Sequence, residues 1–321
     1  MHKKLLNEAT FYLTISVEGP LLVKSGTETW DPAVPDMQFV RTRDAQFRET
    51  IFIPGSSLKG TLRSYSEKIA RTLNVDCCDP FDDIHSCSKR LEELGRENKA
   101  AEIYKESCAA CKLYGSTNMA GRSAFADAYL TKPLDVAKQL TKRTAVAIDR
   151  VLGSVAVGPF DFEALISGEF GTQIRLHNFE LWQLGLLGLA IRDLCLDRIR
   201  VGYGKSRGFG SISAKITKLE LRSIAEGGLS TIDGKLTLKG IGALISQEER
   251  GRYDIHETEP VSVPTTVIPI VDWLATSVIF ERSPDATDWF PPAVDALLGQ
   301  CVKSAWKRYT LTHQVNGGRN G

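Results

Sequence analysis

The sequence predicts an α+β fold with a ferredoxin-like or RRM-like core, and three observations lead to this prediction. Several short segments alternate apolar and polar residues, which is typical of half-buried strands. Two longer segments, residues 58–73 and 181–196, are apolar at helical spacing or nearly throughout, as expected of helices that pack on a sheet. The order is strand, helix, strand, strand, helix, strand, which is the order of this fold. The predicted strands are residues 10–17, 123–130, 171–179 and 212–221.

The first strand has two chemically different faces. A break at residues 19–20 and a long irregular stretch separate it from the next strand-like segment, residues 49–53. Loops of this length inside compact domains are usually functional or disordered. The apolar face of the first strand comprises Phe11, Leu13, Ile15 and Val17.

A strand, a tight turn and a helix are predicted for residues 49–73. Ser56 and Ser57 follow the turn as candidate N-caps, and Lys59 and Arg63 share one face of the helix. Small residues let a ligand approach the backbone closely, and free N–H groups at the start of a helix bind anions. The segment is therefore predicted to bind a phosphate backbone. The alternative is an ordinary capped helix with a solvated basic face.

Five of the seven cysteines lie in residues 74–112, which look like an insertion into the core. Two cysteines three residues apart grip one metal ion, and a second pair about twenty residues away completes a tetrahedral zinc shell. A closed shell of thiolates leaves no position for a catalytic water, so we expect a structural zinc. Reduced core cysteines and redox chemistry are the alternatives. The predicted ligands are Cys78, Cys87, Cys108 and Cys111, with Cys77 and His85 as substitutes.

The net charge of the chain does not indicate a nucleic-acid partner. There are 40 Lys and Arg against 39 Asp and Glu, a formal net charge of +1, so any RNA site must be a local patch. No apolar run is long enough to span a bilayer, and the N-terminus is not a signal peptide, so a soluble, cytoplasmic protein is expected. Three basic clusters qualify as local patches: Lys59, Arg63, Lys68 and Arg71; Lys142, Arg143 and Arg150; Arg198, Arg200, Lys205 and Arg207.

We expect a core domain over residues 1–225 and an extension over residues 226–321 that either completes it or stands alone. Residues 89–106 read as a charged helix and residues 131–144 as a polar stretch. The extension has strand-like residues 236–245 and 277–280, an amphipathic helix at 292–309 and a polar tail at 316–321.

Residues 202–210 are rich in glycine, but two familiar nucleotide-binding motifs do not fit them. A Walker loop needs glycine where Ile199 stands, and the dinucleotide fingerprint needs glycine where Arg207 stands.

Three motifs together resemble the RAMP superfamily, the backbone subunits of type III CRISPR effector complexes. They are residues 53–63, residues 147–150 with the apolar segment that follows, and residues 202–210, in the family's order. The resemblance covers roughly residues 10–220. It points to a Csm- or Cmr-like subunit, with subtype III-D among the candidates.

The resemblance implies how such a chain holds RNA. A β-hairpin thumb at about residues 145–162 would splay the guide–target duplex, with Arg150 on a phosphate; an ordinary core hairpin is the alternative. Gly204, Lys205, Arg207 and Gly208 would lie near guide RNA, together with Ser56, Ser57, Lys59 and Arg63, unless the glycine loop is merely a structural turn. The residues that would wedge against bases are Val151, Leu152, Val155 and Val157.

The resemblance also implies an enzyme that acts only within the assembled complex. Asp36, with Asp31 as the alternative, matches the family's loop aspartate for target cleavage with Mg²⁺ or Mn²⁺, which leaves a 5′-hydroxyl and a 2′,3′-cyclic phosphate. The implied partners are CRISPR guide RNA, target RNA, paralogous RAMP subunits and the large signature subunit. A non-catalytic guide-RNA scaffold is the main alternative, and a guide-processing endoribonuclease that uses histidine is the second.

Overall fold

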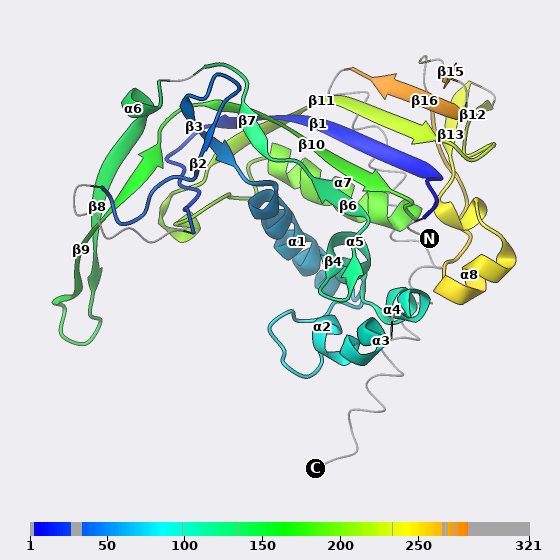
Figure 1. Ribbon diagram of the computed structural model, residues 1–321, viewed down its shortest axis with the longest axis horizontal. Coiled ribbons are helices and arrows are strands. Elements are labelled where there is room, and N and C mark those ends of the chain that lie inside the picture. The colour runs from blue at the N-terminus through cyan, green and yellow to red at the C-terminus, as the bar shows by residue number, and fades with distance from the viewer. Residues whose placement is uncertain are drawn as a thin grey trace, which may run out of the picture.

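The computed structural model describes residues 3–26, 34–97, 99–133, 135–232, 234–264, 267, 269–272 and 274–281. In this part of the chain the central sheet follows the order β15-β16-β11-β1-β10-β7-β3-β2, and β6 also pairs with β10 (Figure 1). All these pairs are antiparallel. The strands of this sheet are β1 (Asn7–Val17), β2 (Arg41–Arg43), β3 (Glu49–Ile53), β6 (Ser123–Phe125), β7 (Ala128–Leu130), β10 (Glu169–His177), β11 (Ile212–Ser223), β15 (Ile270–Asp272) and β16 (Ala275–Phe280).

The predicted ferredoxin-like core is confirmed. Four neighbouring positions in the sheet, β11, β1, β10 and β6/β7, have the strand order that the sequence of elements requires. Helices α1 (Gly55–Thr72) and α7 (Leu181–Cys195) pack side by side on one face of the sheet, as Figure 1 shows. A hydrogen bond of 2.8 Å from the Tyr65 hydroxyl to Asp193 links the two helices. The core lies between these helices and the buried face of β1.

Helix α1 is not capped by Ser56 or Ser57, which corrects the predicted N-caps. The helix begins at Gly55, so both serines lie in its first turn, and neither side chain makes a capping hydrogen bond. Asp127 takes this role instead: its carboxylate accepts the N–H of Gly55 at 2.7 Å. A Cβ atom on Gly55 would lie 2.4 Å from the carbonyl oxygen of Phe125, so the helix start is packed closely against the β6–β7 segment.

The predicted strand at residues 123–130 is two short strands. Between β6 and β7 the N–H of Ala126 donates to Gln173 at 3.0 Å, and the Thr172 hydroxyl donates to the Ala126 carbonyl at 2.8 Å. These contacts replace regular pairing at the point where Asp127 turns toward helix α1.

The insertion contains several short helices where the sequence predicted one over residues 89–106. Gly95 lies inside the second of them and lowers its helix propensity. Folded this way, the segment can return both ends toward α1. Its elements are α2 (Cys87–Arg90), α3 (Glu92–Arg96), α4 (Ala100–Glu106), α5 (Ala109–Tyr114), β4 (Gly115–Ser116) and β5 (Met119–Ala120).

A long hairpin of β8 (Leu140–Ile148) and β9 (Val155–Leu165) projects from the sheet (Figure 1). It is longer than the predicted thumb at 145–162, and it includes part of the stretch read as polar, residues 131–144, which also holds α6 (Val136–Gln139). Alternating hydrophobicity does not mark the ends of this hairpin, because much of it is exposed on both faces.

Part of the extension joins the central sheet, because β16 pairs with β11. The predicted strand at 277–280 is confirmed within β16, whereas the one at 236–245 is only partly right: a strand is followed there by a 3-10 helix. The predicted helix at 292–309 and the tail at 316–321 lie outside the described residues. No helix in the described part of the chain is long and apolar enough to cross a bilayer. The remaining elements are η1 (Lys205–Arg207), β12 (Leu229–Ile232), β13 (Lys235–Leu238), η2 (Ile241–Ala243), α8 (Gln247–Tyr253) and β14 (Val261–Pro264).

Candidate nucleic-acid interface and metal centre

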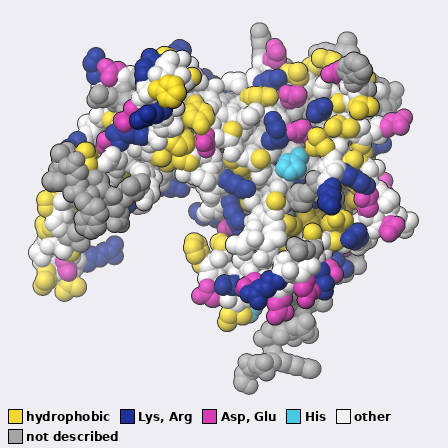
Figure 2. All heavy atoms as spheres, viewed as in Figure 1, with side chains coloured by type: hydrophobic (Ala, Val, Ile, Leu, Met, Phe, Trp, Pro, Cys, Tyr) yellow, Lys and Arg dark blue, Asp and Glu magenta, His cyan; other side chains and the backbone are white. Residues whose placement is uncertain are grey.

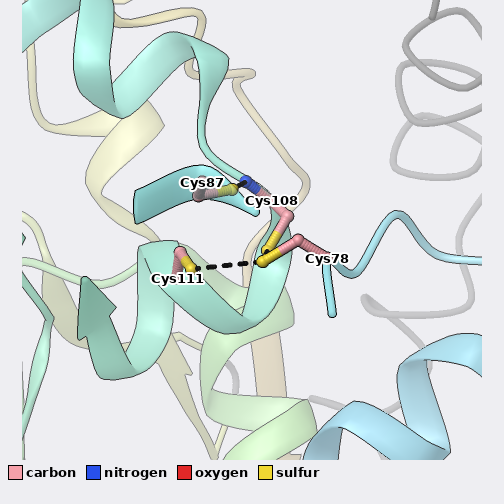
Figure 3. A group of neighbouring side chains, drawn as sticks. All are labelled: Cys78, Cys87, Cys108 and Cys111. Atoms are coloured by element: carbon pink, nitrogen blue, oxygen red, sulfur yellow. Dashed lines mark hydrogen bonds between the residues drawn. The ribbon is translucent and has the colours of Figure 1, made fainter. Parts of the chain in front are cut away.

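Four cysteine sulfur atoms of the insertion converge (Figure 3). All four Sγ atoms lie within 4.8 Å of one another. The Sγ atom of Cys78 lies 3.6 Å from that of Cys108 and 3.8 Å from that of Cys111. A tetrahedral zinc ion with Zn–S bonds of about 2.3 Å needs sulfur atoms about 3.8 Å apart. The spacing fits a closed shell for a structural metal ion such as zinc. This cysteine cluster consists of Cys78, Cys87, Cys108 and Cys111.

Two short helices and a loop position the cysteine cluster. Cys87 is the first residue of α2, and Cys108 directly precedes α5. The N–H of Cys108 donates to the sulfur of Cys87 at 3.4 Å. Hydrogen bonds from Cys111 and from Cys77 hold the pKa of the Cys108 thiol well below its usual range. The hydrogen bond to Cys108 in turn raises the pKa of the Cys111 thiol, so the neighbouring thiols stabilise one thiolate, and a bound metal ion would displace the remaining protons.

The two substitute ligands lie outside the cluster. Cys77 borders it, and its thiol points toward the carbonyl oxygen of Cys78 at 3.9 Å. His85 has an exposed side chain whose Nδ1 lies 3.0 Å from a carboxylate oxygen of Asp82. The cluster therefore contains the four cysteines that the sequence favoured.

The glycine loop, residues 202–210, is held against the segment that follows β1. The N–H of Tyr203 donates to the carbonyl of Leu22 at 2.7 Å. A Cβ atom on Gly210 would lie 2.1 Å from the carbonyl oxygen of Val201, so glycine is required there by the backbone. Four glycines of the loop have φ values between 71° and 84°: Gly202, Gly204, Gly208 and Gly210.

Two of these glycines give a matched test of the loop. Gly210→Ala is expected to lower the free energy of unfolding by more than about 2 kcal/mol. The new Cβ atom would clash with the carbonyl oxygen of Val201, and the backbone there is left-handed. Gly208→Ala meets nothing within 4 Å and should cost about 1 kcal/mol, from backbone strain alone. Urea unfolding of the two variants measures the difference, and equal losses would contradict the close approach at Gly210.

Exposed cations of the glycine loop lie beside helix α1. Lys205 and Arg207 are exposed on η1, and the Arg207 guanidinium lies 4.9 Å from the centre of the Tyr203 ring. Partial burial, and then the charge of Lys68, lowers the pKa of Lys205. Burial and a neighbouring guanidinium likewise lower the pKa of Lys59. Lys205 and Lys68 repel each other, and a phosphate placed between them would relieve that repulsion, whereas the Lys59 ammonium donates to the carbonyl of Ser123 at 3.3 Å.

The glycine loop also contacts the base of the hairpin, through a pair of aromatic rings and through Arg143 of the second predicted basic cluster. The ring of Phe209 packs edge to face on that of Phe162, with 5.4 Å between ring centres. The Arg143 guanidinium lies 5.6 Å from the centre of the Phe209 ring. Figure 2 shows the surface hollowed between the hairpin and the body of the molecule, with Lys and Arg side chains along the body's side of the hollow.

The tip of the hairpin is apolar and exposed, so this is not a core hairpin. Val151 is 91% and Leu152 78% exposed, and Val155 is also exposed. The Asp149 carboxylate accepts the N–H groups of Val151 and Leu152 at 2.6 and 2.9 Å, which fixes the turn. Arg150 is exposed within that turn. The side chain of Val157 lies outside the described residues.

Asp36 lies at the base of the same hairpin. Its side chain is exposed, and one carboxylate oxygen accepts the N–H of Asp161 at 2.8 Å. The neighbouring Met37 hydrogen-bonds along β9 on both sides, which fixes the loop. Asp161 itself is paired with Lys142 at 2.6 Å, and this hydrogen bond lowers the pKa of Asp161. Asp31 lies outside the described residues.

A protein-family model described as the RAMP superfamily matches residues 14–213, which is more than half of the chain. The chain belongs to the RAMP superfamily. The match runs from β1 into β11 and includes the cysteine cluster, the hairpin and the glycine loop. Membership places this RAMP protein among CRISPR-associated RNA-binding subunits. A search of curated proteins found no match.

In this RAMP chain Arg63 faces the cysteine cluster and not the solvent. Its guanidinium hydrogen-bonds to Glu67 at 2.9 Å, to the carbonyl of Gly115 at 2.8 Å and to the sulfur of Cys111 at 3.5 Å. Only 24% of its side chain is exposed. The sequence placed Arg63 beside Lys59 on one helix face correctly, but residues from a distant segment engage its donor groups.

Arg63→Gln is expected to weaken zinc binding about tenfold, since partners outside the ligand shell orient and stabilise metal-bound sulfur. Competition with a chromophoric chelator measures the affinity. Lys68→Gln removes the same charge from an exposed position of the same helix, away from the cluster, and serves as the control. Equal zinc affinities in the two variants would reject a role for Arg63 at the cluster.

Proposed function

We propose that this chain is a guide-RNA-binding backbone subunit of a type III CRISPR interference complex, and that it cuts the base-paired target RNA. The observation that carries the proposal is that the cationic glycine loop lies beside helix α1 and also packs on the base of an exposed apolar hairpin. In this proposal the subunit is cytoplasmic, stands beside paralogous RAMP subunits and the large signature subunit, and is Csm- or Cmr-like, with subtype III-D among the candidates.

Guide RNA binds through its phosphates in this proposal. Lys205, Arg207 and Lys59 supply the charge, while Gly204 and Gly208 let the backbone approach closely. Phosphate contacts position RNA without reading its sequence, and base pairing between guide and target supplies the specificity. The hydroxyls of Ser56 and Ser57 and the guanidinium of Arg150 are further donors. Arg63 is assigned to the metal centre.

The hairpin tip interrupts the guide–target duplex. Val151 and Leu152 offer exposed apolar surface that can replace the stacking of a displaced base. Because the Asp149 carboxylate fixes the turn, the tip keeps its shape when it meets RNA. When a base is displaced, the phosphodiester bond next to it becomes accessible.

Cleavage is assigned to Asp36, with Asp31 as the alternative. Mg²⁺ is commonly coordinated by one or two carboxylates together with substrate phosphates. One exposed carboxylate beside an RNA backbone would provide such a set of ligands. The ion, or Mn²⁺, would stabilise charge that develops on the phosphate. Asp36 would hold the ion or help deprotonate the 2′-hydroxyl, while Lys142 keeps the neighbouring Asp161 neutralised. The 2′-hydroxyl gives up its proton and its oxygen attacks the adjacent phosphorus, the bond from phosphorus to the 5′-oxygen breaks, and the leaving oxygen takes a proton from water, which gives a 2′,3′-cyclic phosphate and a 5′-hydroxyl.

Charge reversal on the glycine loop tests the RNA-binding part of the proposal. The double variant Lys205→Glu, Arg207→Glu is expected to raise the Kd for guide RNA at least tenfold. The slope of log Kd against log salt concentration should fall by more than about 1, which corresponds to the loss of more than one phosphate contact. Fluorescence anisotropy over a salt series measures both. Lys105→Glu, on the exposed side of α4, is the matched control. Unchanged guide affinity in the double variant would overturn the proposal.

A further inference from the structure

A pocket of about 450 Å³ opens at the end of the sheet where β3 and β7 separate. The two strands pair only at Phe52–Tyr129 and Ile53–Ala128. Beyond Leu130 the chain turns toward β10, where the N–H of Thr131 donates to Glu169 at 2.9 Å. The volume lies within the ~300–1,000 Å³ typical of small-ligand sites. The pocket is lined by residues of the β2–β3 hairpin and by residues 129–133.

The lining combines an aromatic ring with an excess of positive charge. Tyr129 is 52% exposed, and its ring stacks on Phe52 with 5.9 Å between centres and 17° between planes. Arg48 is paired with Asp44 at 2.7 Å. The other two cations of the lining form no ion pair with any described residue; they are Arg43 and Lys132.

The wall formed by the β2–β3 hairpin is ordered by its own hydrogen bonds. The Asp44 carboxylate accepts the N–H groups of Gln46 and Arg48, each at 2.9 Å, and the Nε–H of Arg48 at 2.8 Å. These hydrogen bonds, above all the one from the backbone N–H of Arg48, lower the pKa of Asp44. Arg41 at the start of this hairpin pairs with Glu163 of β9 at 2.7 Å. The pocket is therefore tied to the strand that also positions Asp36.

We propose that this pocket binds one nucleotide, with its base stacked on Tyr129 and its phosphate beside Arg43 and Lys132. An aromatic ring backed by a second ring suits any base, and cations without a carboxylate partner suit a phosphate. The nucleotide belongs either to an RNA strand leaving the hollow or to the free pool, since both present the same chemistry. The first source rests on the proposed function, and the second does not.

The test measures nucleotide binding by the full chain, with fluorescein-labelled hexauridylate for a strand and UMP for a free nucleotide. Tyr129→Ala is expected to raise the Kd about tenfold, the loss typical of one stacked base, whereas Tyr129→Phe keeps the ring and the affinity. Arg43→Ala with Lys132→Ala should weaken binding and lower its salt dependence. Controls remove a ring that is still more exposed, and an exposed charge, from the insertion: Phe81→Ala and Lys105→Ala.

The two ligands distinguish the sources. Loss with hexauridylate, while UMP does not bind, assigns the pocket to a strand, and loss with UMP assigns it to a free nucleotide. If Tyr129→Ala binds both ligands like the wild type, the proposal is overturned, and so it is if the variant impairs only assembly with protein subunits. Failure at the pocket with intact sensitivity to Lys205→Glu, Arg207→Glu leaves the proposed function standing. The reverse pattern rejects the proposed function and keeps the pocket.

Discussion

Cys108→Ser is expected to abolish stoichiometric zinc binding and to unfold the insertion, residues 74–112. Structural zinc contributes about 10–16 kcal/mol of apparent binding free energy in small zinc domains, which is more than a local core of this size supplies. The local core contains few buried side chains besides the cysteines themselves: Leu91, Ile103 and Ala110. Elemental analysis measures the metal, and limited proteolysis of the insertion measures its folding.

Controls separate ligand loss from a general effect of removing thiols. Cys77→Ser changes the cysteine that borders the cluster, and Cys195→Ser changes one on α7, far from it in the chain. Both should retain one zinc ion per chain. Lowering the pH should release zinc, because protons compete for the thiolates. A wild-type chain without zinc, prepared without chelator, would contradict the metal site.

Asp36→Asn is expected to reduce cleavage of guide-complementary RNA at least 100-fold in the reconstituted complex with Mg²⁺ or Mn²⁺. The exchange removes the charge and keeps the shape, and the hydrogen bond that Asp36 accepts from Asp161 can persist. Guide and target binding should therefore stay unchanged. Product analysis on gels follows the cut at this subunit.

Two further variants interpret this result. Asp31→Asn tests the alternative residue, and Asp83→Asn removes an exposed carboxylate from the insertion as a control. Loss only with Asp31→Asn would move the catalytic role to that residue. Unchanged cutting with both Asp36→Asn and Asp31→Asn would make the chain a non-catalytic guide-RNA scaffold. The histidine-based alternative would have to use one of the histidines in the described part of the chain: His85 pairs with Asp82, His256 lies 4.0 Å from Asp254, and His177 is partly buried.

The sequence predicted the core well where local pattern and packing agree. β1 alternates because one face is buried, and α7 is apolar because it is buried on nearly all sides. The cysteine cluster was predictable for a similar reason, since metal ligands must be particular residue types at limited spacings.

Long-range contacts explain what the sequence could not predict. Asp127 caps α1 from 72 residues away, so no local motif announces it. Arg63 has the spacing of a phosphate ligand, but the folded insertion engages its guanidinium. The hairpin was predicted too short because both of its faces are largely exposed, so its sequence does not alternate between apolar and polar residues. The pocket at Tyr129 depends on the separation of two strands that are far apart in the sequence.

Helix α1 has a double attachment whose consequence reaches beyond stability. One side of the helix makes both attachments: the Lys59 ammonium donates to the carbonyl of Ser123 in β6 at 3.3 Å, and the Arg63 guanidinium donates to the sulfur of Cys111 at 3.5 Å. A cell short of zinc would therefore produce chains whose sheet is intact but whose helix α1 has lost one of its two anchors. In the proposed complex, RNA binding would then depend on the supply of a trace metal that takes no part in the proposed cleavage.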